Sequence, residues 1–244
     1  TEFINEPYIR INESTTSLRP YKEWIRDIYN SSKDWSKEIV DGASLDDLDG
    51  EAIAVAKKGY KERSNHEFYT LLRYGVNVQT DVSEKKKTVH LIDWNNPTNN
   101  DFYIAEEVTI YGDSKRRPDL VIYVNGIALA IIELKRSTIS VHEGIRQNIR
   151  NQQEEYIPQF FTTIQLLFAG NDTEGLHYGV IKTPEKFWLR WKEPCGDPCA
   201  ASLFTPEAYP NELNRSVLQF FEPSRLLEFI HDFIIYDGGV KKAA

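Results

Sequence analysis

Hydrophobic positions along this chain follow two different periods, and the change between them falls near residue 75. Before that point apolar residues recur at helical spacing, and residues 66–72 predict a short helix that stops near Gly75. After it the pattern is typical of strands, with alternating or continuous apolar runs. We therefore expect a helical N-terminal segment at 1–75, a strand-rich core at 76–194, and a linker with a C-terminal helix at 195–244.

Six strands and two helices are expected from residue 88 onward. Asn125-Gly126 separates two apolar runs and is a strong β-hairpin signal, because both residues tolerate the positive φ of a type I′ turn. The strands of this hairpin are almost wholly apolar, so both of their faces should be covered. This order of elements predicts an α/β layer fold, with a mixed central sheet flanked by helices. The strands are expected at 88–94, 102–111, 119–124, 127–135, 165–169 and 177–182, and the helices at 141–156 and 224–235.

The composition excludes several classes of protein. Of 244 residues, 41% are hydrophobic, so the bulk of the chain can bury a core. A formal net charge of −8 excludes a uniformly basic nucleic-acid coat, although not a local basic patch. Two cysteines are too few for a disulfide scaffold, and no apolar run approaches the ~20 residues of a membrane span, so we expect a cytoplasmic protein without a membrane partner. The chain has no methionine and begins with Thr1, which suggests a piece of a longer protein.

Two carboxylates and a lysine bracket the predicted hairpin. Asp119 opens its first strand, while Glu133 and Lys135 close the second and, being two residues apart, project from one face. A hairpin brings its two ends together, so the three side chains should converge at one edge of the sheet. Two carboxylates form a hard oxygen site that suits Mg²⁺, and a neighbouring ammonium can orient water or offset charge on a phosphoryl group. The pattern favours phosphodiester hydrolysis, with Asp119 and Glu133 as metal ligands.

The register of this hairpin makes the hypothesis testable. A regular two-residue turn at Asn125-Gly126 pairs Asp119 with Ile132, which would leave Asp119 and Glu133 on opposite faces. A three-residue turn or one β-bulge restores Asp119 opposite Glu133. We therefore predict an irregularity in this hairpin.

Arginines lie close to these residues in the sequence. Arg116, Arg117 and Arg136 are expected to form a positive rim for DNA phosphates within an otherwise acidic chain. A simpler interpretation of the same stretch is a turn at Pro118-Asp119 and a solvated strand end at Glu133-Leu134-Lys135, because short motifs match by chance. Both interpretations stay open at the level of residues alone.

The pattern P-D-(x)13-E-L-K resembles the PD-(D/E)xK signature of nucleases with the restriction-endonuclease-like fold. The surrounding sequence resembles the N-terminal nuclease region of the restriction (R) subunit of type I restriction–modification enzymes, from about residue 60 to the end. Residues 1–60 carry no motif of that family. The stretches that carry the resemblance are LIDWNNPTNNDFYIAEEVTI, RRPDLVIYVNGIALAIIELKR, IRQNIRNQQEEYIPQFF, LLFAGNDTEGLHYG and TPEKFWLRWKE.

The resemblance implies a mixed sheet flanked by helices and Mg²⁺-dependent cleavage of double-stranded DNA, with Mn²⁺ as a substitute. It also implies assembly with methylation and specificity subunits. By this matching Asp119 and Glu133 are the metal ligands, and Lys135 is the catalytic lysine. Members of the family continue into an ATP-driven DNA-translocating motor, but this chain has no G-x-x-x-x-G-K-[ST] loop. ATP is therefore expected to act only through a motor domain outside this chain.

The family also has a Q-x-x-x-Y element on the helix that follows the lysine, and here the match is divided. Gln147 stands where the family glutamine is expected, but the residue four positions later is Asn151. Gln152 and Tyr156 have the right spacing but come later, on the expected helix stripe that faces the sheet. Gln147 is favoured by position, and Gln152 and Tyr156 remain candidates whose simpler role is packing.

Two other functions are compatible with this pattern. One is a different PD-(D/E)xK nuclease, of the kind that acts in DNA repair or resolves DNA junctions. The other is a module that keeps the fold for DNA binding or docking and has lost cleavage. The intact set of Asp119, Glu133 and Lys135 argues against the second alternative.

Overall fold

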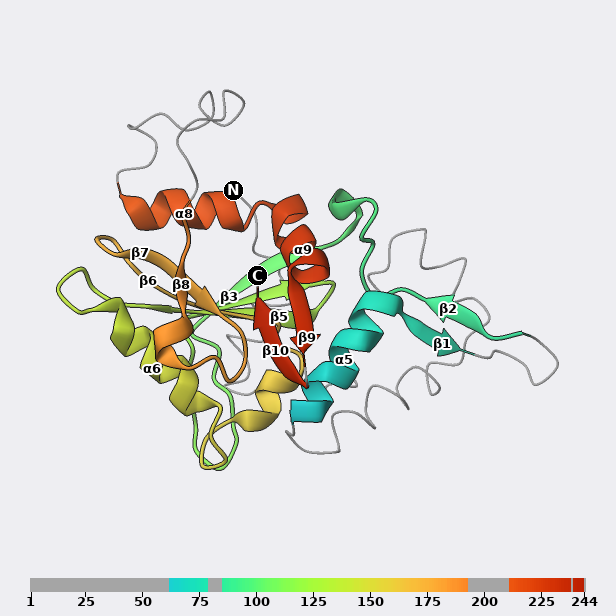
Figure 1. Ribbon diagram of the computed structural model, residues 1–244, viewed down its shortest axis with the longest axis horizontal. Helices are drawn as coiled ribbons and strands as arrows, with labels where there is room; N and C mark the ends of the chain where they lie inside the picture. Colours follow the sequence, from blue (N-terminus) through green and yellow to red (C-terminus); the bar gives the residue numbers. More distant parts are fainter. Residues whose placement is uncertain (1–61, 79–84, 193–210, 238, 244) are drawn as a thin grey trace, which may run out of the picture.

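The computed structural model describes residues 62–78, 85–192, 211–237 and 239–243 (Figure 1). Most of the expected N-terminal segment and the linker, at 1–61 and 193–210, lie outside the described residues. The centre is a six-stranded sheet in the order β3-β4-β5-β6-β7-β8, in which only β5 and β6 run parallel. This confirms the predicted mixed sheet flanked by helices. The strands are β3 (Phe102–Glu106), β4 (Leu120–Val124), β5 (Ile127–Leu134), β6 (Leu166–Asn171), β7 (Gly175–Gly179) and β8 (Leu189–Arg190).

The hairpin of β4 and β5 has both a two-residue turn and a bulge. Asn125 and Gly126 have φ angles of 49° and 81°, as a type I′ turn requires. Val124 pairs with Ile127 at the turn, but the register then shifts by one residue between Ile122 and Tyr123. The extra residue is Leu129 on β5, so Leu120 faces Ile132 and the next position along brings Asp119 opposite Glu133. The predicted irregularity is therefore confirmed.

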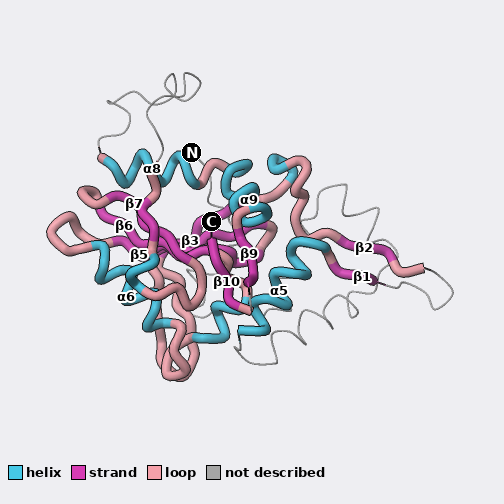
Figure 2. The backbone as a smooth tube through the Cα atoms, viewed as in Figure 1, coloured by secondary structure: helices cyan, strands magenta, loops and turns pink. Residues whose placement is uncertain are grey.

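Helices cover both faces of the sheet (Figure 2). One face packs on α6 (Val141–Asn151) through a cluster that includes Val121, Ile131 and Ile145. The other face packs on helices from the two ends of the described chain, through a cluster that includes Phe168 and Phe220. Those helices are α5 (Glu62–Tyr74), α8 (Glu212–Phe220) and α9 (Pro223–Asp232), and short 3-10 turns lie at η1 (Pro97–Asn99), η2 (Pro158–Thr162) and η3 (Glu185–Phe187).

Helix α6 is shorter than its periodicity indicates. A helix at 141–156 was expected, but it ends at Asn151, and Gln152 is its C-cap. The backbone N–H of Ile157 donates to the carbonyl of Asn151, which turns the chain back toward the sheet. Ile157 precedes Pro158, and a residue before proline is disfavoured in the helical conformation, so the helix cannot continue into η2. Tyr156 therefore lies in the turn after the helix, not on a helical stripe.

Two small antiparallel sheets flank the main one. The first pairs β1 (Val76–Val78) with β2 (Lys87–Val89), so the strand expected at 88–94 is mostly a loop. The second pairs β9 (Ile234–Asp237) with β10 (Val240–Ala243) at the end of the chain. None of the described helices has the length and apolar character that crossing a bilayer requires.

The β9–β10 hairpin is tied to the core by a buried lysine. Lys241 is 4% exposed, and its Nζ donates to the Oδ1 of Asn65, 3.0 Å away, and to the Oε1 of Gln165. Tyr236 also donates to the same oxygen of Asn65. Burial lowers the pKa of Lys241 well below its usual value. The C-terminal hairpin is thus fixed to α5 and to the start of β6 by polar contacts.

Candidate active site

Asp119 and Glu133 project from the same face of the sheet because of the bulge at Leu129. Side chains alternate along a strand, so Asp119 shares the face of Val121, and Glu133 shares the face of Ile131. Val121 and Ile131 both belong to the cluster beneath α6. The Oδ2 of Asp119 accepts a hydrogen bond of 2.7 Å from the backbone N–H of Leu134. The Asp119 side chain therefore bridges the first strand of the hairpin to the end of the second.

Lys135 completes the set that the sequence predicts. Its Nζ lies 3.9 Å from Asp119 Oδ2 and 3.8 Å from Glu133 Oε2, and its side chain is 17% exposed. The same Nζ donates to the carbonyl of Leu134 at 3.1 Å. The structure thus brings one cationic and two acidic side chains together at the edge where β4 begins and β5 ends.

Glu133 is a buried carboxylate. Its side chain is fully buried, and among the described residues neither Oε1 nor Oε2 has a hydrogen-bond partner. Burial, followed by repulsion from Asp119, raises the pKa of Glu133 to about 8, although Lys135 opposes this shift. A buried ionised carboxylate is stable only when it is paired or bound to a metal. The ammonium of Lys135, 3.8 Å from Oε2, is therefore not enough to hold Glu133 ionised at neutral pH.

These features fit a divalent metal ion. The unpartnered oxygens of Glu133 and the free Oδ1 side of Asp119 offer hard oxygen ligands of the kind that Mg²⁺ and Mn²⁺ prefer. Within the described ranges no group of three or more His, Cys, Asp or Glu side chains could hold a metal, so this would be a two-carboxylate site. Mg²⁺ usually keeps several waters and uses only one or two carboxylates, which makes two such ligands sufficient.

Helix α6 closes over Glu133 at a glycine. A Cβ added to Gly144 would lie 3.1 Å from the Cβ of Ala169 and 3.3 Å from the carbonyl oxygen of Glu133. This close approach leaves no room for a larger residue between α6 and β5. Gly144 was not predicted as part of the site, because its only signal in the sequence is a glycine inside an otherwise helical pattern.

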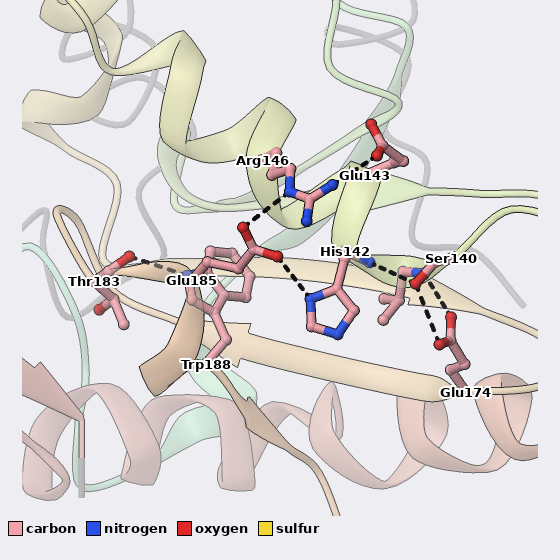
Figure 3. A network of polar contacts seen from close by, with 9 residues as sticks. Ser140, His142, Glu143, Arg146, Glu174, Thr183, Glu185 and Trp188 are labelled. Carbon is pink, nitrogen blue, oxygen red and sulfur yellow. Dashed lines mark hydrogen bonds and ion pairs between the residues drawn. The ribbon is translucent and has the colours of Figure 1, made fainter.

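The opposite flanks of α6 have different neighbours. His142 and Arg146 lie one helical turn apart, and both contact Glu185 of η3 at 2.9 Å (Figure 3). Because η3 follows β7, this flank faces away from β4 and the carboxylates. Gln147 is three residues beyond Gly144 and lies on the other flank, toward β4. Its half-buried side chain is therefore on the side of α6 where the carboxylates lie.

The other two candidates of the Q-x-x-x-Y element have partners of their own. Gln152 donates to the carbonyl of Asn148 at 3.0 Å and accepts from the backbone N–H of Lys182 at 2.7 Å. These contacts use both ends of its amide to fasten the end of α6. Tyr156 lies beneath Arg116, whose guanidinium carbon is 4.1 Å from the centre of the tyrosine ring. These contacts do not place Gln152 or Tyr156 beside Asp119 and Glu133.

The three arginines expected at the rim differ in their surroundings. Arg116 is partly buried and stacked on Tyr156. Arg117 is exposed, and its Nη2 lies 3.3 Å from Glu107, so part of its charge is offset. Arg136 is exposed and follows Lys135 directly. Their contacts with DNA stay a prediction.

Comparisons with known proteins all find similarity to type I restriction enzymes. A family model described as the N terminus of the type I restriction enzyme R protein matches residues 9–186. A protein of Methanocaldococcus jannaschii, provisionally named the type I restriction enzyme MjaIXP endonuclease subunit, is 29% identical over 70% of this chain and 18% of its own length. The type I restriction enzyme HindI endonuclease subunit of Haemophilus influenzae is 28% identical over 71% of this chain and 16% of its own. The chain thus spans less than a fifth of these relatives.

Proposed function

The chain belongs to the family of type I restriction enzyme R proteins, whose N-terminal region it matches, and from this premise we propose that it is a metal-dependent endodeoxyribonuclease domain. The observation that carries the proposal is the convergence of Asp119, Glu133 and Lys135 at one edge of the sheet. Relatives named as endonuclease subunits support it. A repair or resolvase nuclease is less consistent with the family match, and a non-cleaving module has no need to keep a partly buried lysine beside two carboxylates.

Asp119 and Glu133 would hold Mg²⁺, or Mn²⁺ in its place. When bound, the ion supplies Lewis-acid chemistry, since it polarises a phosphoryl oxygen and lowers the pKa of a coordinated water. Asp119 keeps its orientation because the backbone N–H of Leu134 holds its Oδ2. Glu133 presents two oxygens that accept no hydrogen bond within the described residues, and Oε2 lies 3.8 Å from the Lys135 ammonium. The ligands are therefore pre-oriented by the hairpin rather than recruited from mobile side chains.

Lys135 would act on the phosphate and on the attacking water. Its Nζ has one donor engaged by the carbonyl of Leu134, which leaves other N–H groups for an incoming oxygen. An ammonium at this point offsets the charge that grows on the phosphoryl oxygens as water attacks phosphorus and the P–O bond to the leaving oxygen breaks. Gln147, on the flank of α6 toward β4, would hydrogen-bond the same water or phosphate.

The substrate would be double-stranded DNA, with Arg116, Arg117 and Arg136 at its backbone. An isolated chain of net charge −8 should bind DNA weakly, so we expect most phosphate contacts to come from the remainder of the R protein and from the methylation and specificity subunits. ATP would act through a motor domain in that remainder. The cytoplasm, where such a complex meets incoming DNA, is the proposed location.

The test of this function uses the complete R protein that contains this chain, assembled with its partner subunits. Lys135→Ala should remove DNA cleavage while ATP hydrolysis continues. Lys186→Ala, which removes an exposed lysine of η3, is the matched control and should leave both activities unchanged. Cleavage that persists in Lys135→Ala would reject the assignment of the site.

A further inference from the structure

A short loop in front of Asp119 is held tightly against the turn that follows α6. The backbones of Ile110 and Arg116 exchange two hydrogen bonds, of 2.8 and 2.9 Å, and close a small hairpin over the residues between them. This hairpin contacts the turn through Asp113, whose N–H donates to the carbonyl of Tyr156 at 3.1 Å. Ser114 donates to the carbonyl of Glu155 at 2.7 Å. The loop at 110–116 and the turn at 155–157 therefore form one unit.

Close packing makes this unit rigid. A Cβ added to Gly112 would lie 2.2 Å from the carbonyl oxygen of Tyr156, a distance that no side chain tolerates. From the other side of the turn, Gln159 donates to the carbonyl of Tyr111 at 3.1 Å. The backbone of Tyr156 is thus fixed relative to the loop by contacts that do not involve its side chain.

The guanidinium of Arg116 is held by an aromatic ring and not by a carboxylate. Its guanidinium lies over the ring of Tyr156, and its Nη1 donates to the carbonyl of Lys115 at 2.9 Å. In the described parts of the chain it has no carboxylate within ion-pair distance, whereas Arg117 has one and Arg146 has two. A guanidinium that is ordered by stacking but not neutralised remains available to an anion.

We propose that Tyr156 is a positioning residue that holds the Arg116 guanidinium for a phosphate of the DNA backbone beside the cleavage site. This inference rests on the proposed nuclease function. Arg116 precedes Asp119 by three residues, so its backbone lies within about 11 Å of the metal ligand along the chain. Holding a long side chain in one orientation before binding removes part of the entropy that a free arginine loses when it contacts a phosphate. Tyr156 therefore acts through Arg116 and not on the reacting atoms.

The experiment measures binding of a fluorescein-labelled DNA duplex to this chain by anisotropy, across a series of salt concentrations without a divalent metal. Arg116→Gln should weaken binding and lower the slope of log K against log salt by about 0.9, the value for one lost phosphate contact. Tyr156→Leu should weaken binding by a similar factor at every salt concentration, because the freed Arg116 still reaches the phosphate but loses more entropy. It should weaken binding no further in the Arg116→Gln background, where there is no guanidinium to hold. Tyr156→Phe keeps the ring and should restore the original affinity.

The control for net charge is Arg225→Gln, which removes one cation from α9 on the opposite face of the sheet. It should leave the slope unchanged. The proposal is overturned if Arg116→Gln does not change the slope, if Tyr156→Leu weakens binding as much in the Arg116→Gln background as in the unsubstituted chain, or if the unsubstituted chain shows no binding at low salt. Metal uptake by Glu133→Gln, measured without DNA, decides the nuclease proposal separately.

Discussion

The carboxylate of Asp119 is hydrogen-bonded to the backbone of Leu134, the residue between the other two members of the site. This contact exists only because Leu129 adds one residue to β5 and turns Glu133 to the face of Asp119. The hairpin therefore also determines which side chains form the site. Its register decides which of its end residues lie together, and the apolar runs on either side of Asn125-Gly126 make that register costly to change.

Replacing Glu133 should change how stability depends on pH. The pKa of Glu133 is raised from 4.5 to about 8, so the folded chain binds a proton that the unfolded chain releases between these values. Stability from this group is complete below pH 4.5 and is lost as the pH rises through about 8. In the absence of metal, Glu133→Gln should remove this loss, which is on the order of a few kcal/mol. Urea denaturation of both proteins at several pH values measures it.

Added Mg²⁺ should offset the loss of stability that the unsubstituted chain shows at high pH. Because binding requires the ionised carboxylate, added Mg²⁺ should raise the melting temperature more above pH 8 than near pH 6. Glu133→Gln should show little response at either pH. An equal Mg²⁺ response in the two proteins would mean that the ion binds elsewhere.

Gly144 should not accept a larger side chain. Ala169 and the backbone of Glu133 already lie within 3.1 and 3.3 Å of an added Cβ, so valine must push α6 away from β5. We expect Gly144→Val to cost about 1–3 kcal/mol of stability, as overpacked sites do. It should also weaken metal binding, because Glu133 loses the cover that fixes it. Thermal denaturation and metal titration of the variant test this, and a variant with unchanged metal affinity would show that α6 does not influence the site.

Much of this site could be predicted from the sequence because its signals are local. Asn125-Gly126 located the turn, and the charged residues at both ends of the hairpin located the edge. The requirement that Asp119 and Glu133 share a face then predicted an irregular register, although not that Leu129 would be the extra residue. A bulge inside a continuous apolar run leaves no signal in composition.

The end of α6 was harder to predict, because helical periodicity continues past Asn151 in the sequence. Pro158 prevents the helix from reaching η2, but the stop at Asn151 coincides with tertiary contacts of the residues that follow it. The Gln152 amide oxygen accepts from the backbone N–H of Lys182, and the backbone N–H of Asp113 donates to the carbonyl of Tyr156. Those partners lie far away in the sequence, so no local pattern reports them. The short sheets at the two ends of the described chain were missed for the same reason.

Lys241 provides a test of the C-terminal hairpin that is independent of the active site. Burial lowers the pKa of this lysine, so near neutral pH the unfolded chain holds its proton more strongly than the folded chain does. Its contribution to stability therefore rises as the pH increases toward its unfolded value of about 10.4. Lys241→Met should show a smaller rise than the unsubstituted chain in urea denaturation between neutral pH and about pH 10. An identical rise in both proteins would indicate that Lys241 is solvated.

Uptake of Mn²⁺ by this chain, measured by calorimetric titration without DNA, tests the central claim most directly. The account predicts binding that Asp119→Asn and Glu133→Gln each abolish, because it assigns the metal to these two carboxylates. Glu143→Gln, which removes an exposed carboxylate of α6 that pairs with Arg146, should bind as the unsubstituted chain does. Equal uptake by the chain and by both ligand variants would contradict the account.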